Sequence, residues 1–219
     1  MSQVEIHSGR VALPGELTVP PDAVGISVFA HGSGSSRLSP RNVAVARAMN
    51  ERGIATLLFD LLTPVEANDR GNVFDIDLLS DRLEAATRWA MAAEGSAGLP
   101  VGLFGASTGA AAALVVAARL SDGITAVVSR GGRPDLAGEA LELVTAPTLL
   151  IVGSEDPVVV EVNRQALGSL RCEKRLEVIP GAGHLFEEPG ALEHVSELAA
   201  EWFARHLRRA GAAGAHEAG

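Results

Sequence analysis

Short runs of almost wholly apolar residues recur along the chain from residue 24 onward, and polar or amphipathic stretches separate them. Most of these runs do not alternate between apolar and polar positions, so both faces of each predicted strand are expected to be covered, as in a parallel sheet between two helix layers. The runs predict strands at residues 24–30, 54–60, 100–104, 124–129, 147–152 and 175–179.

The stretches between these runs have helical patterns. Ser39 and Pro40 are suited to the N-cap and first turn of a helix, and residues 109–120 are apolar almost all round, which predicts a buried helix. Strands and helices that alternate in this way are typical of a parallel α/β sheet with right-handed crossovers. Further helices are predicted near residues 76–90, 135–143, 158–168 and 192–203, the pattern at 135–143 being weaker.

The first 20 residues precede this alternation and have a different pattern. Residues 4–10 and 15–20, linked through Pro14 and Gly15, predict an antiparallel hairpin at the edge of the sheet. We expect one domain over residues 1–209, because 219 residues with 47% apolar side chains suffice for one core. Residues 210–219 lack periodicity and large apolar groups, so we expect a flexible tail there.

The net charge and the hydropathy of the chain argue against nucleic acid and membrane as partners. The formal net charge is −9, which argues against a nucleic-acid partner because nucleic-acid binding relies on Lys and Arg side chains that neutralise phosphates. The longest apolar run, residues 110–118, is about half of a membrane span, and the N-terminus lacks the pattern of a leader peptide. We therefore expect a cytoplasmic protein without membrane contact. The single cysteine, Cys172, cannot form an internal disulfide.

The connections after the predicted strands contain the candidate chemistry, because ligands of such sheets bind beyond the carboxyl ends of the strands. Residues 105–109, GASTG, form a G-x-S-x-G motif between a strand and a helix. This context is the one required to expose a nucleophilic serine, Ser107, on a tight turn above a helix N-terminus. The alternative is that Ser107 is an ordinary N-cap.

Two further connections supply an acid and a base. Asp156, with Glu155 as the rival, follows the strand at 147–152 and could orient a histidine, although Asp before Pro157 is also a good helix start. His184 follows the last strand after a run of small residues that allows a sharp bend. A lone loop histidine is more often an ordinary polar residue, but serine, acid and histidine occur here in the chain order of the α/β hydrolases.

A glycine-rich connection, residues 31–36, follows the strand at 24–30. Backbone N–H groups at Ser33 and Thr108 could bind the oxyanion of a tetrahedral intermediate. A glycine-rich loop can alternatively hold a phosphate, but neither the G-x-x-x-x-G-K-S/T motif nor the G-x-G-x-x-G motif is present.

Taken together, these motifs resemble those of the α/β-hydrolase superfamily and, within it, of the dienelactone-hydrolase-like group. The resemblance implies an α/β fold with a mostly parallel, eight-stranded sheet flanked by helices, and a triad of Ser107, Asp156 and His184. Dienelactone hydrolase proper has cysteine where this chain has serine, which puts lactone specificity in doubt. The chain is also similar to small hydrolase domains that accompany a phosphoribosyltransferase domain in some proteins, and we expect no such second domain within these 219 residues. The matching segments are HGSGSS (31–36), GASTG (105–109), GSEDPVV (153–159) and GAGHLFEEPG (181–190).

Several charged residues on the ligand side of the sheet are candidates for substrate binding. A planar guanidinium suits a substrate carboxylate, so Arg130 or Arg133 could bind one, or both could pair with Asp135 and other acids and only brace their loop. Arg37, Arg41 and Glu66 are similar candidates. The six histidines show none of the close spacings of a zinc centre, so we expect neither a metal nor a cofactor.

These features predict a serine hydrolase that cleaves a small ester, thioester or lactone through an acyl-enzyme. Residues 61–75 are the only insertion that could cover the site, so we expect a minimal cap and an open pocket for a small-molecule acyl substrate. Acyl transfer to another acceptor uses the same triad and stays open, as does a non-catalytic binding module that retains the fold. A homodimer is a further possibility.

Overall fold

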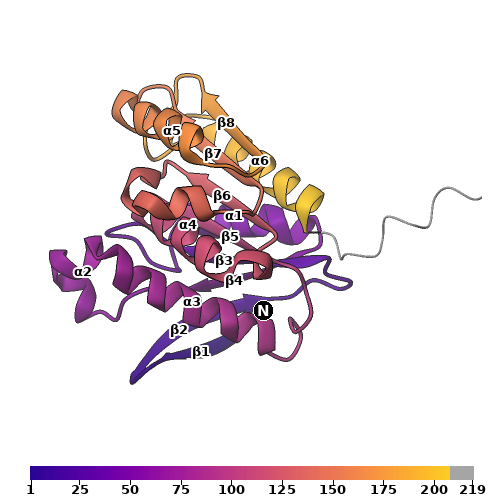
Figure 1. Cartoon of the computed structure of the whole chain (residues 1–219). Coiled ribbons are helices and arrows are strands. Elements are labelled where there is room, and N and C mark those ends of the chain that lie inside the picture. Colours follow the sequence, from indigo (N-terminus) through magenta and orange to yellow (C-terminus); the bar gives the residue numbers. More distant parts are fainter. Residues whose placement is uncertain (208–219) are drawn as a thin grey trace, which may run out of the picture.

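The predicted apolar runs form the strands of one sheet in the computed structural model, which describes residues 1–207 (Figure 1). The eight strands lie in the order β1-β2-β4-β3-β5-β6-β7-β8. Neighbouring strands from β4 to β8 run parallel, because helices make the connections between them. These strands are β3 (Gly25–Ala30), β4 (Ile54–Phe59), β5 (Val101–Ala106), β6 (Ala126–Arg130), β7 (Thr148–Gly153) and β8 (Lys174–Ile179).

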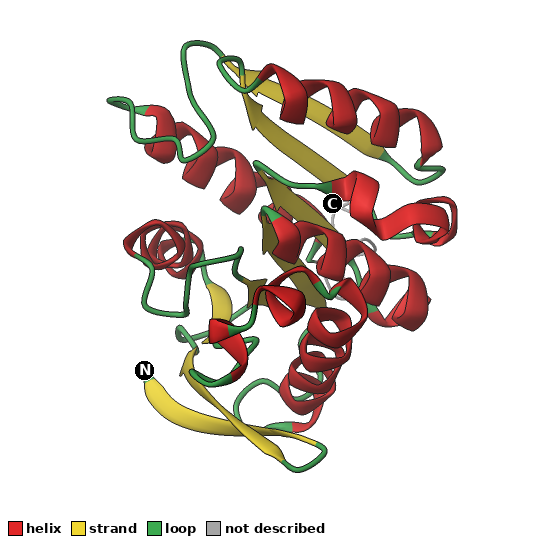
Figure 2. Ribbon diagram, turned by 90° about the vertical axis from the view of Figure 1, so that its left-hand side faces the viewer, coloured by secondary structure: helices red, strands yellow, loops and turns green. Residues whose placement is uncertain are grey.

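Helices cover both faces of the sheet (Figure 2). Side chains alternate along each strand, so Phe104 packs with α1 (Pro40–Glu51) and α6 (Ala191–His206), whereas Leu103 packs with α3 (Ile76–Ala92) and α4 (Thr108–Leu120) on the opposite face. Five of the predicted helices are confirmed with small shifts at their ends. They are α1 (Pro40–Glu51), α3 (Ile76–Ala92), α4 (Thr108–Leu120), α5 (Pro157–Ser169) and α6 (Ala191–His206).

The N-terminal hairpin is present, but its predicted turn is wrong. Strands β1 (Ser2–Ser8) and β2 (Val11–Thr18) are joined at Gly9, whose φ of +62° suits a tight turn. Pro14 and Gly15 lie inside β2, where Gly15 allows the close approach of β4: a Cβ at this position would lie 3.2 Å from the Cβ of Phe59. Proline and glycine therefore lie inside the second strand of the hairpin and not in its turn.

Two connections differ from the sequence-based prediction. The predicted helix at 135–143 is a 3₁₀ segment, η3 (Pro134–Leu143), because Gly138 with φ +54° interrupts it. The insertion between β4 and α3 contains two short helices, η1 (Glu66–Asn68) and α2 (Arg70–Phe74), which the sequence did not predict. Another short turn, η2 (Ser121–Gly123), follows α4. None of these segments forms a large cap over the sheet.

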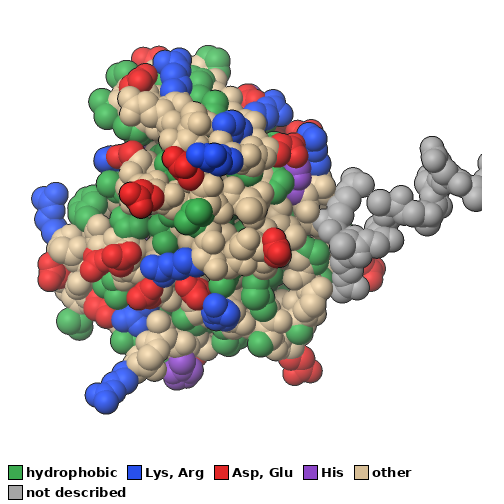
Figure 3. Space-filling view, viewed as in Figure 1, with side chains coloured by type: hydrophobic (Ala, Val, Ile, Leu, Met, Phe, Trp, Pro, Cys, Tyr) green, Lys and Arg blue, Asp and Glu red, His purple; other side chains and the backbone are tan. Residues whose placement is uncertain are grey.

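The parallel strands bring the connections after β3, β5, β6, β7 and β8 to one edge of the sheet. Acidic and basic side chains are interspersed on the face of the molecule that Figure 3 shows. Within residues 1–207, no helix is both long enough and apolar enough to cross a membrane. The predicted tail at 210–219 lies outside the described residues.

Candidate active site

Ser107 occupies a sharp turn between β5 and α4. Its backbone angles are φ +51° and ψ −120°, a conformation that residues other than glycine rarely adopt and that is often associated with functional sites. Ser107 stands at the N-cap of α4, but its side chain makes no capping hydrogen bond. The N-cap alternative therefore does not account for this serine.

Small residues around Ser107 make this turn possible. A Cβ on Gly105 would lie 2.4 Å from Ala110 Cα, and a Cβ on Gly109 would lie 2.2 Å from the carbonyl oxygen of Ala30. Gly32 in the connection after β3 also lies close to the turn, since a Cβ there would lie 2.9 Å from the Cβ of Ser107. The glycines of the motif thus allow β3, β5 and α4 to meet beneath the serine.

Asp156, and not its neighbour Glu155, contacts the imidazole of His184. Asp156 Oδ2 lies 2.8 Å from His184 Nδ1, whereas Glu155 Oε1 accepts a hydrogen bond from Ser154 Oγ at 2.9 Å. Asp156 Oδ1 also accepts from the N–H of Val159 at 3.3 Å and so caps α5. The helix-start and imidazole-orienting interpretations are therefore compatible. A carboxylate accepts hydrogen bonds, so this contact favours the imidazole tautomer that carries its proton on Nδ1 and leaves Nε2 as an acceptor.

The loop that carries His184 is seated firmly on the end of β7. The carbonyl of Ala182 accepts a hydrogen bond from the N–H of Glu155 at 3.0 Å. Phe186 is buried with a positive φ of 56°, and the N–H of Gly183 donates to Glu188 Oε1 at 3.0 Å. These contacts fix the backbone on both sides of the histidine. The roles of Phe186 and Glu188 were not predicted, because each depends on contacts with the folded loop.

The connection after β6 contacts both the serine and the histidine. The N–H of Ser107 donates to the carbonyl of Arg130 at 3.2 Å, and the N–H of Arg133 donates to the carbonyl of Ser107 at 3.1 Å. A Cβ on Gly131 would lie 3.6 Å from His184 Cε1. Ser107 and His184 therefore lie against the same short segment, although no hydrogen bond joins Ser107 Oγ to the imidazole within residues 1–207.

The connection after β3 lines a cavity of about 330 Å³ next to the serine. His31 fixes this connection: its Nε2 accepts from the N–H of Leu61 and its Nδ1 lies 3.0 Å from the carbonyl of Gly32. Burial lowers the pKa of His31, although the Gly32 carbonyl and Asp60 oppose this effect. The cavity is lined by residues 31–36 and by Asp60, Leu61, Leu62, Pro64, Ala67, Val73 and Leu79.

The two predicted oxyanion donors belong to the connections after β3 and β5. Ser33 lines the cavity, and Thr108 is the first residue of α4, so its N–H has no acceptor within the helix. The apolar part of the cavity was not predicted, because it combines the end of β4 with η1, α2 and α3. Hydrophobic residues in the 61–79 region were the only sequence signal for it.

Most of the charged candidates for substrate binding are paired within the protein. Hydrogen bonds from Thr63 and the charge of Arg82 hold the pKa of Glu66 below its usual value despite a burial effect in the opposite direction. Asp135 raises the pKa of Arg133 through a hydrogen bond, against the effect of burial. The pairs are Arg37 with Asp60, Arg41 with Glu187, Glu66 with Arg82, and Arg133 with Asp135.

Arg130 is the exception. It is 8% exposed, and its guanidinium lies over the ring of Phe104 at 5.9 Å. Burial and the nearby charge of Arg41 lower the pKa of Arg130 to about 10. In the part of the chain that the structure describes, no acid pairs with it.

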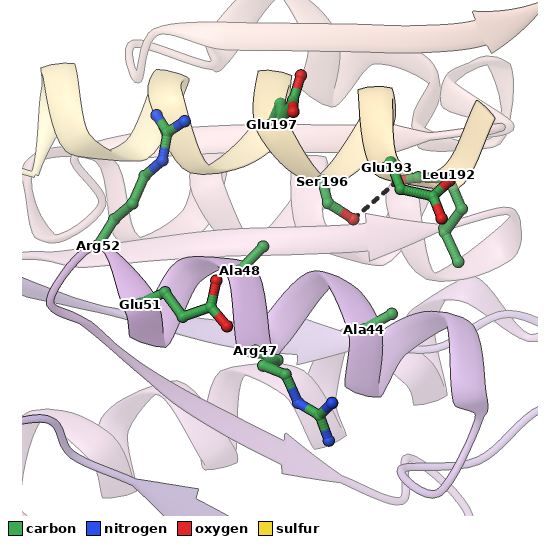
Figure 4. Close-up of a pocket in the computed structure, with 9 residues that line it drawn as sticks. All are labelled: Ala44, Arg47, Ala48, Glu51, Arg52, Leu192, Glu193, Ser196 and Glu197. Carbon is green, nitrogen blue, oxygen red and sulfur yellow. Dashed lines mark hydrogen bonds between the residues drawn. The ribbon is translucent and has the colours of Figure 1, made fainter. Parts of the chain in front are cut away.

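A second cavity, of about 400 Å³, lies between α1 and α6 (Figure 4). Ala44, Ala48 and Ser196 point into the space between the helices, whereas Arg47 and Glu197 point away from it. None of the predicted site residues lines this cavity. Residues 1–207 also contain no group of three or more His, Cys, Asp or Glu side chains placed to hold a metal ion.

Comparison with known families agrees with the fold described above. The model of the dienelactone hydrolase family matches residues 50–208. The chain belongs to the dienelactone hydrolase family. A dienelactone hydrolase from Anabaena variabilis ATCC 29413, known from its crystal structure, is 54% identical with a TM-score of 0.91, over 94% of this chain and 98% of that chain. The predicted α/β-hydrolase fold is thereby confirmed.

Further matches of this dienelactone hydrolase family member are one solved structure with the same fold and two curated relatives. Est1E from Butyrivibrio proteoclasticus, whose structure includes bound ferulic acid, is 19% identical with a TM-score of 0.79 over 93% of this chain and 98% of that chain, and shares the fold. Proteins from two Mycobacterium tuberculosis strains, CDC 1551 / Oshkosh and H37Rv, carry a provisional phosphoribosyl transferase name. They are 56% identical over 97% of this chain, but the chain spans only 48% of their length.

Proposed function

We propose that this protein hydrolyses small esters, thioesters or lactones through an acyl-enzyme on Ser107. The observation that carries the proposal is the hydrogen-bonded Asp156–His184 pair, whose histidine lies against the same connection after β6 as Ser107, a serine with strained backbone angles. A nucleophile, a base and an acid that orients the base are the three parts that serine acyl transfer requires. Membership of the dienelactone hydrolase family supports the same reaction class.

In the proposed mechanism, His184 Nε2 accepts the proton of Ser107 Oγ while Oγ attacks the carbonyl carbon. The C–O or C–S bond to the leaving group breaks as His184 returns the proton to that group. Water then attacks the acyl-enzyme with His184 again as base, which releases the acid and regenerates Ser107. Asp156 holds the imidazole in the required tautomer throughout. Catalytic hydrogen bonds often tighten only when the substrate is bound, so Ser107 and His184 need to pair only at that stage.

The oxyanion of the tetrahedral intermediate would be bound by the N–H groups of Thr108 and Ser33. Thr108 offers the N–H of the first residue of α4, where the positive end of the helix dipole favours negative charge. The removal of one such donor typically costs about 2.7–4 kcal/mol in transition-state stabilisation. The 330 Å³ cavity beside Ser33 has the size and apolar lining for a small acyl or alcohol group.

The proposal is tested with Ser107→Ala and, as a matched control, Ser169→Ala at the exposed end of α5. We expect Ser107→Ala to retain the native circular dichroism spectrum but to lose turnover of short p-nitrophenyl esters and labelling by a fluorophosphonate probe. Ser169→Ala should retain both. Unchanged turnover by Ser107→Ala, or a wild-type protein that neither labels nor cleaves the esters, would contradict the proposal and favour a binding module.

Acyl transfer stays a second outcome of the same chemistry, because the pocket and not the triad selects the acceptor. Product analysis with competing alcohols and amines separates the two: free acid as the dominant product supports hydrolysis. The phosphoribosyl transferase name of the Mycobacterium relatives describes proteins about twice as long as the matched region, so we assign no such activity to this chain.

A further inference from the structure

Asn163 is an unusual residue for the middle of a buried helix. It is 0% exposed on α5, and its Nδ2 donates to the carbonyl of Val159 at 2.8 Å and to that of Gly132 at 2.9 Å. Its Oδ1 is buried without a hydrogen-bond partner in residues 1–207. Asparagine is a weak helix former, and an unpaired buried oxygen costs free energy. The stability of α5 therefore does not account for an asparagine at this position.

The bond to Gly132 crosses from α5 to the connection after β6, residues 131–133. Gly132 is packed too tightly for a side chain: a Cβ there would lie 2.0 Å from Ser129 Oγ and 2.6 Å from Ala110 Cβ. Ser129 belongs to β6, and Ala110 belongs to α4, the helix that follows the proposed nucleophile. Gly132 therefore lies between β6 and α4, and Asn163 fixes its carbonyl to a third element.

The neighbours of Gly132 in this connection contact the proposed catalytic residues. The N–H of Arg133 donates to the carbonyl of Ser107 at 3.1 Å. On the other side, a Cβ on Gly131 would lie 3.2 Å from the carbonyl oxygen of His184. The bond from α5 thus reaches the residue that lies between these two contacts, one to the nucleophile and one to the base.

The same helix also positions the acid. Asp156 is the N-cap of α5, and Asn163 lies about two turns further along, so both project from the same side of the helix. Val159 lies between them: its N–H donates to Asp156 Oδ1, and its carbonyl accepts from Asn163 Nδ2. One face of α5 thus holds the acid at its start and the connection after β6 further along.

We propose that Asn163 is a positioning residue, which holds the connection after β6 in place and thereby fixes Ser107 and His184 relative to each other. This inference rests on the proposed hydrolase function. Without the Nδ2 donor, the buried carbonyl of Gly132 loses this hydrogen bond, so the connection is expected to move. A displacement of about 1 Å between reacting groups can cost about 100-fold in rate.

The kinetic test uses Asn163→Leu, which keeps the branching of the side chain and removes both donated hydrogen bonds. For a short p-nitrophenyl ester we expect kcat to fall by about 10–100-fold with little change in KM, because the cavity beside Ser33 does not include the connection after β6. The control is Thr87→Val in α3, where the hydroxyl donates to the carbonyl of Leu83 at 2.8 Å. It removes a comparable bond from a buried helix and should retain the wild-type kcat. Equal kcat in Asn163→Leu and the wild type would overturn the proposal.

A second variant separates the two bonds of Asn163. The hydroxyl of Asn163→Thr has one hydrogen, so it can replace the bond to Val159, as Thr87 donates to the carbonyl four residues before it. It cannot donate to Gly132 at the same time. We expect Asn163→Thr to remain as slow as Asn163→Leu. A wild-type kcat in Asn163→Thr would show that only the helix needs this residue, and would overturn the proposal.

Amide hydrogen exchange tests the positioning role without any turnover. Peptides that cover residues 129–134 and 105–110 should exchange faster in Asn163→Leu than in the wild type, and peptides from α3 should be unchanged. Thr87→Val should show the reverse pattern. Unchanged exchange in the first two peptides would overturn the inference even if kcat falls. A wild type that cleaves no ester would refute the proposed function alone, because the exchange result still decides the role of Asn163.

Discussion

Asp156 combines a structural contact with a proposed chemical one at the scale of a single residue. One carboxylate oxygen caps α5 through the N–H of Val159, and the other lies 2.8 Å from His184 Nδ1. Asparagine is as good an N-cap as aspartate, but its side-chain NH₂ group cannot accept the Nδ1–H hydrogen bond. Substitution to asparagine can therefore separate the two roles.

We expect Asp156→Asn to lower kcat for a p-nitrophenyl ester by about 10⁴-fold, because the imidazole then takes the wrong tautomer. The melting temperature should change little, since the cap is preserved. Steady-state kinetics and thermal unfolding measure the two effects.

Glu155→Gln is the matched control, because Glu155 contacts Ser154 instead of the imidazole. It should retain wild-type kcat. A large loss of activity in Glu155→Gln together with an active Asp156→Asn would mean that the acid has been assigned to the wrong residue.

At the scale of the elements, the insertion between β4 and α3 is tied to the N-terminal hairpin by one side chain of α3. Arg82 donates both to Ser8 at the end of β1 and to Glu66 in η1. The insertion also lines the cavity beside Ser33 through Ala67 and Val73. The position of this cavity wall thus depends on a partly buried ion pair that joins the insertion to α3 and, through Arg82, to the end of β1.

We expect Arg82→Met to lower the free energy of unfolding by about 1–3 kcal/mol, because it removes the donor of the Ser8 carbonyl and the charged partner of Glu66. Urea denaturation measures this loss. Arg88→Met on the same helix is the control: Arg88 forms an exposed pair with Glu84, and such pairs are worth about 0–1 kcal/mol. Equal losses in the two variants would show that the Arg82 contacts contribute no special stability.

At the scale of the whole molecule, stability is expected to depend on pH through a buried histidine. His31 joins the connection after β3 to the end of β4, and burial lowers its pKa below the usual 6.5. The unfolded chain therefore binds a proton at this residue at a higher pH than the folded protein does. Stability from this source is complete above pH 6.5 and falls as the pH drops toward the lowered pKa. Burial lowers the pKa of His206 as well, so it contributes in the same direction.

The measurement is the free energy of unfolding at pH 7.5 and at pH 5.5. The wild type should lose stability between the two values, and His31→Gln should lose less, because glutamine does not titrate and its side-chain oxygen can still accept from the N–H of Leu61. If His31→Gln shows the full wild-type loss, residues other than His31 determine the pH dependence.

Local patterns in the sequence determined the main strands, five of the helices and the position of the candidate nucleophile. Apolar runs and helical spacing depend on neighbours within a few residues, so they can be read from the chain alone. The G-x-S-x-G motif at 105–109 is likewise a local pattern, because the tight turn needs small residues next to Ser107.

Contacts between distant segments were decided only by the tertiary structure. The sequence left both Glu155 and Asp156 open as the acid that orients the histidine. In the folded protein the His184 loop brings the imidazole to Asp156. The hairpin turns at Gly9 and not at Pro14 and Gly15. Gly15 lies inside β2, where it allows the close approach of β4. The sequence placed Arg130 and Arg133 in one loop, but burial without a partner distinguishes Arg130 from the paired Arg133. Burial and pairing depend on which segments the fold brings together, and neither follows from spacing along the chain.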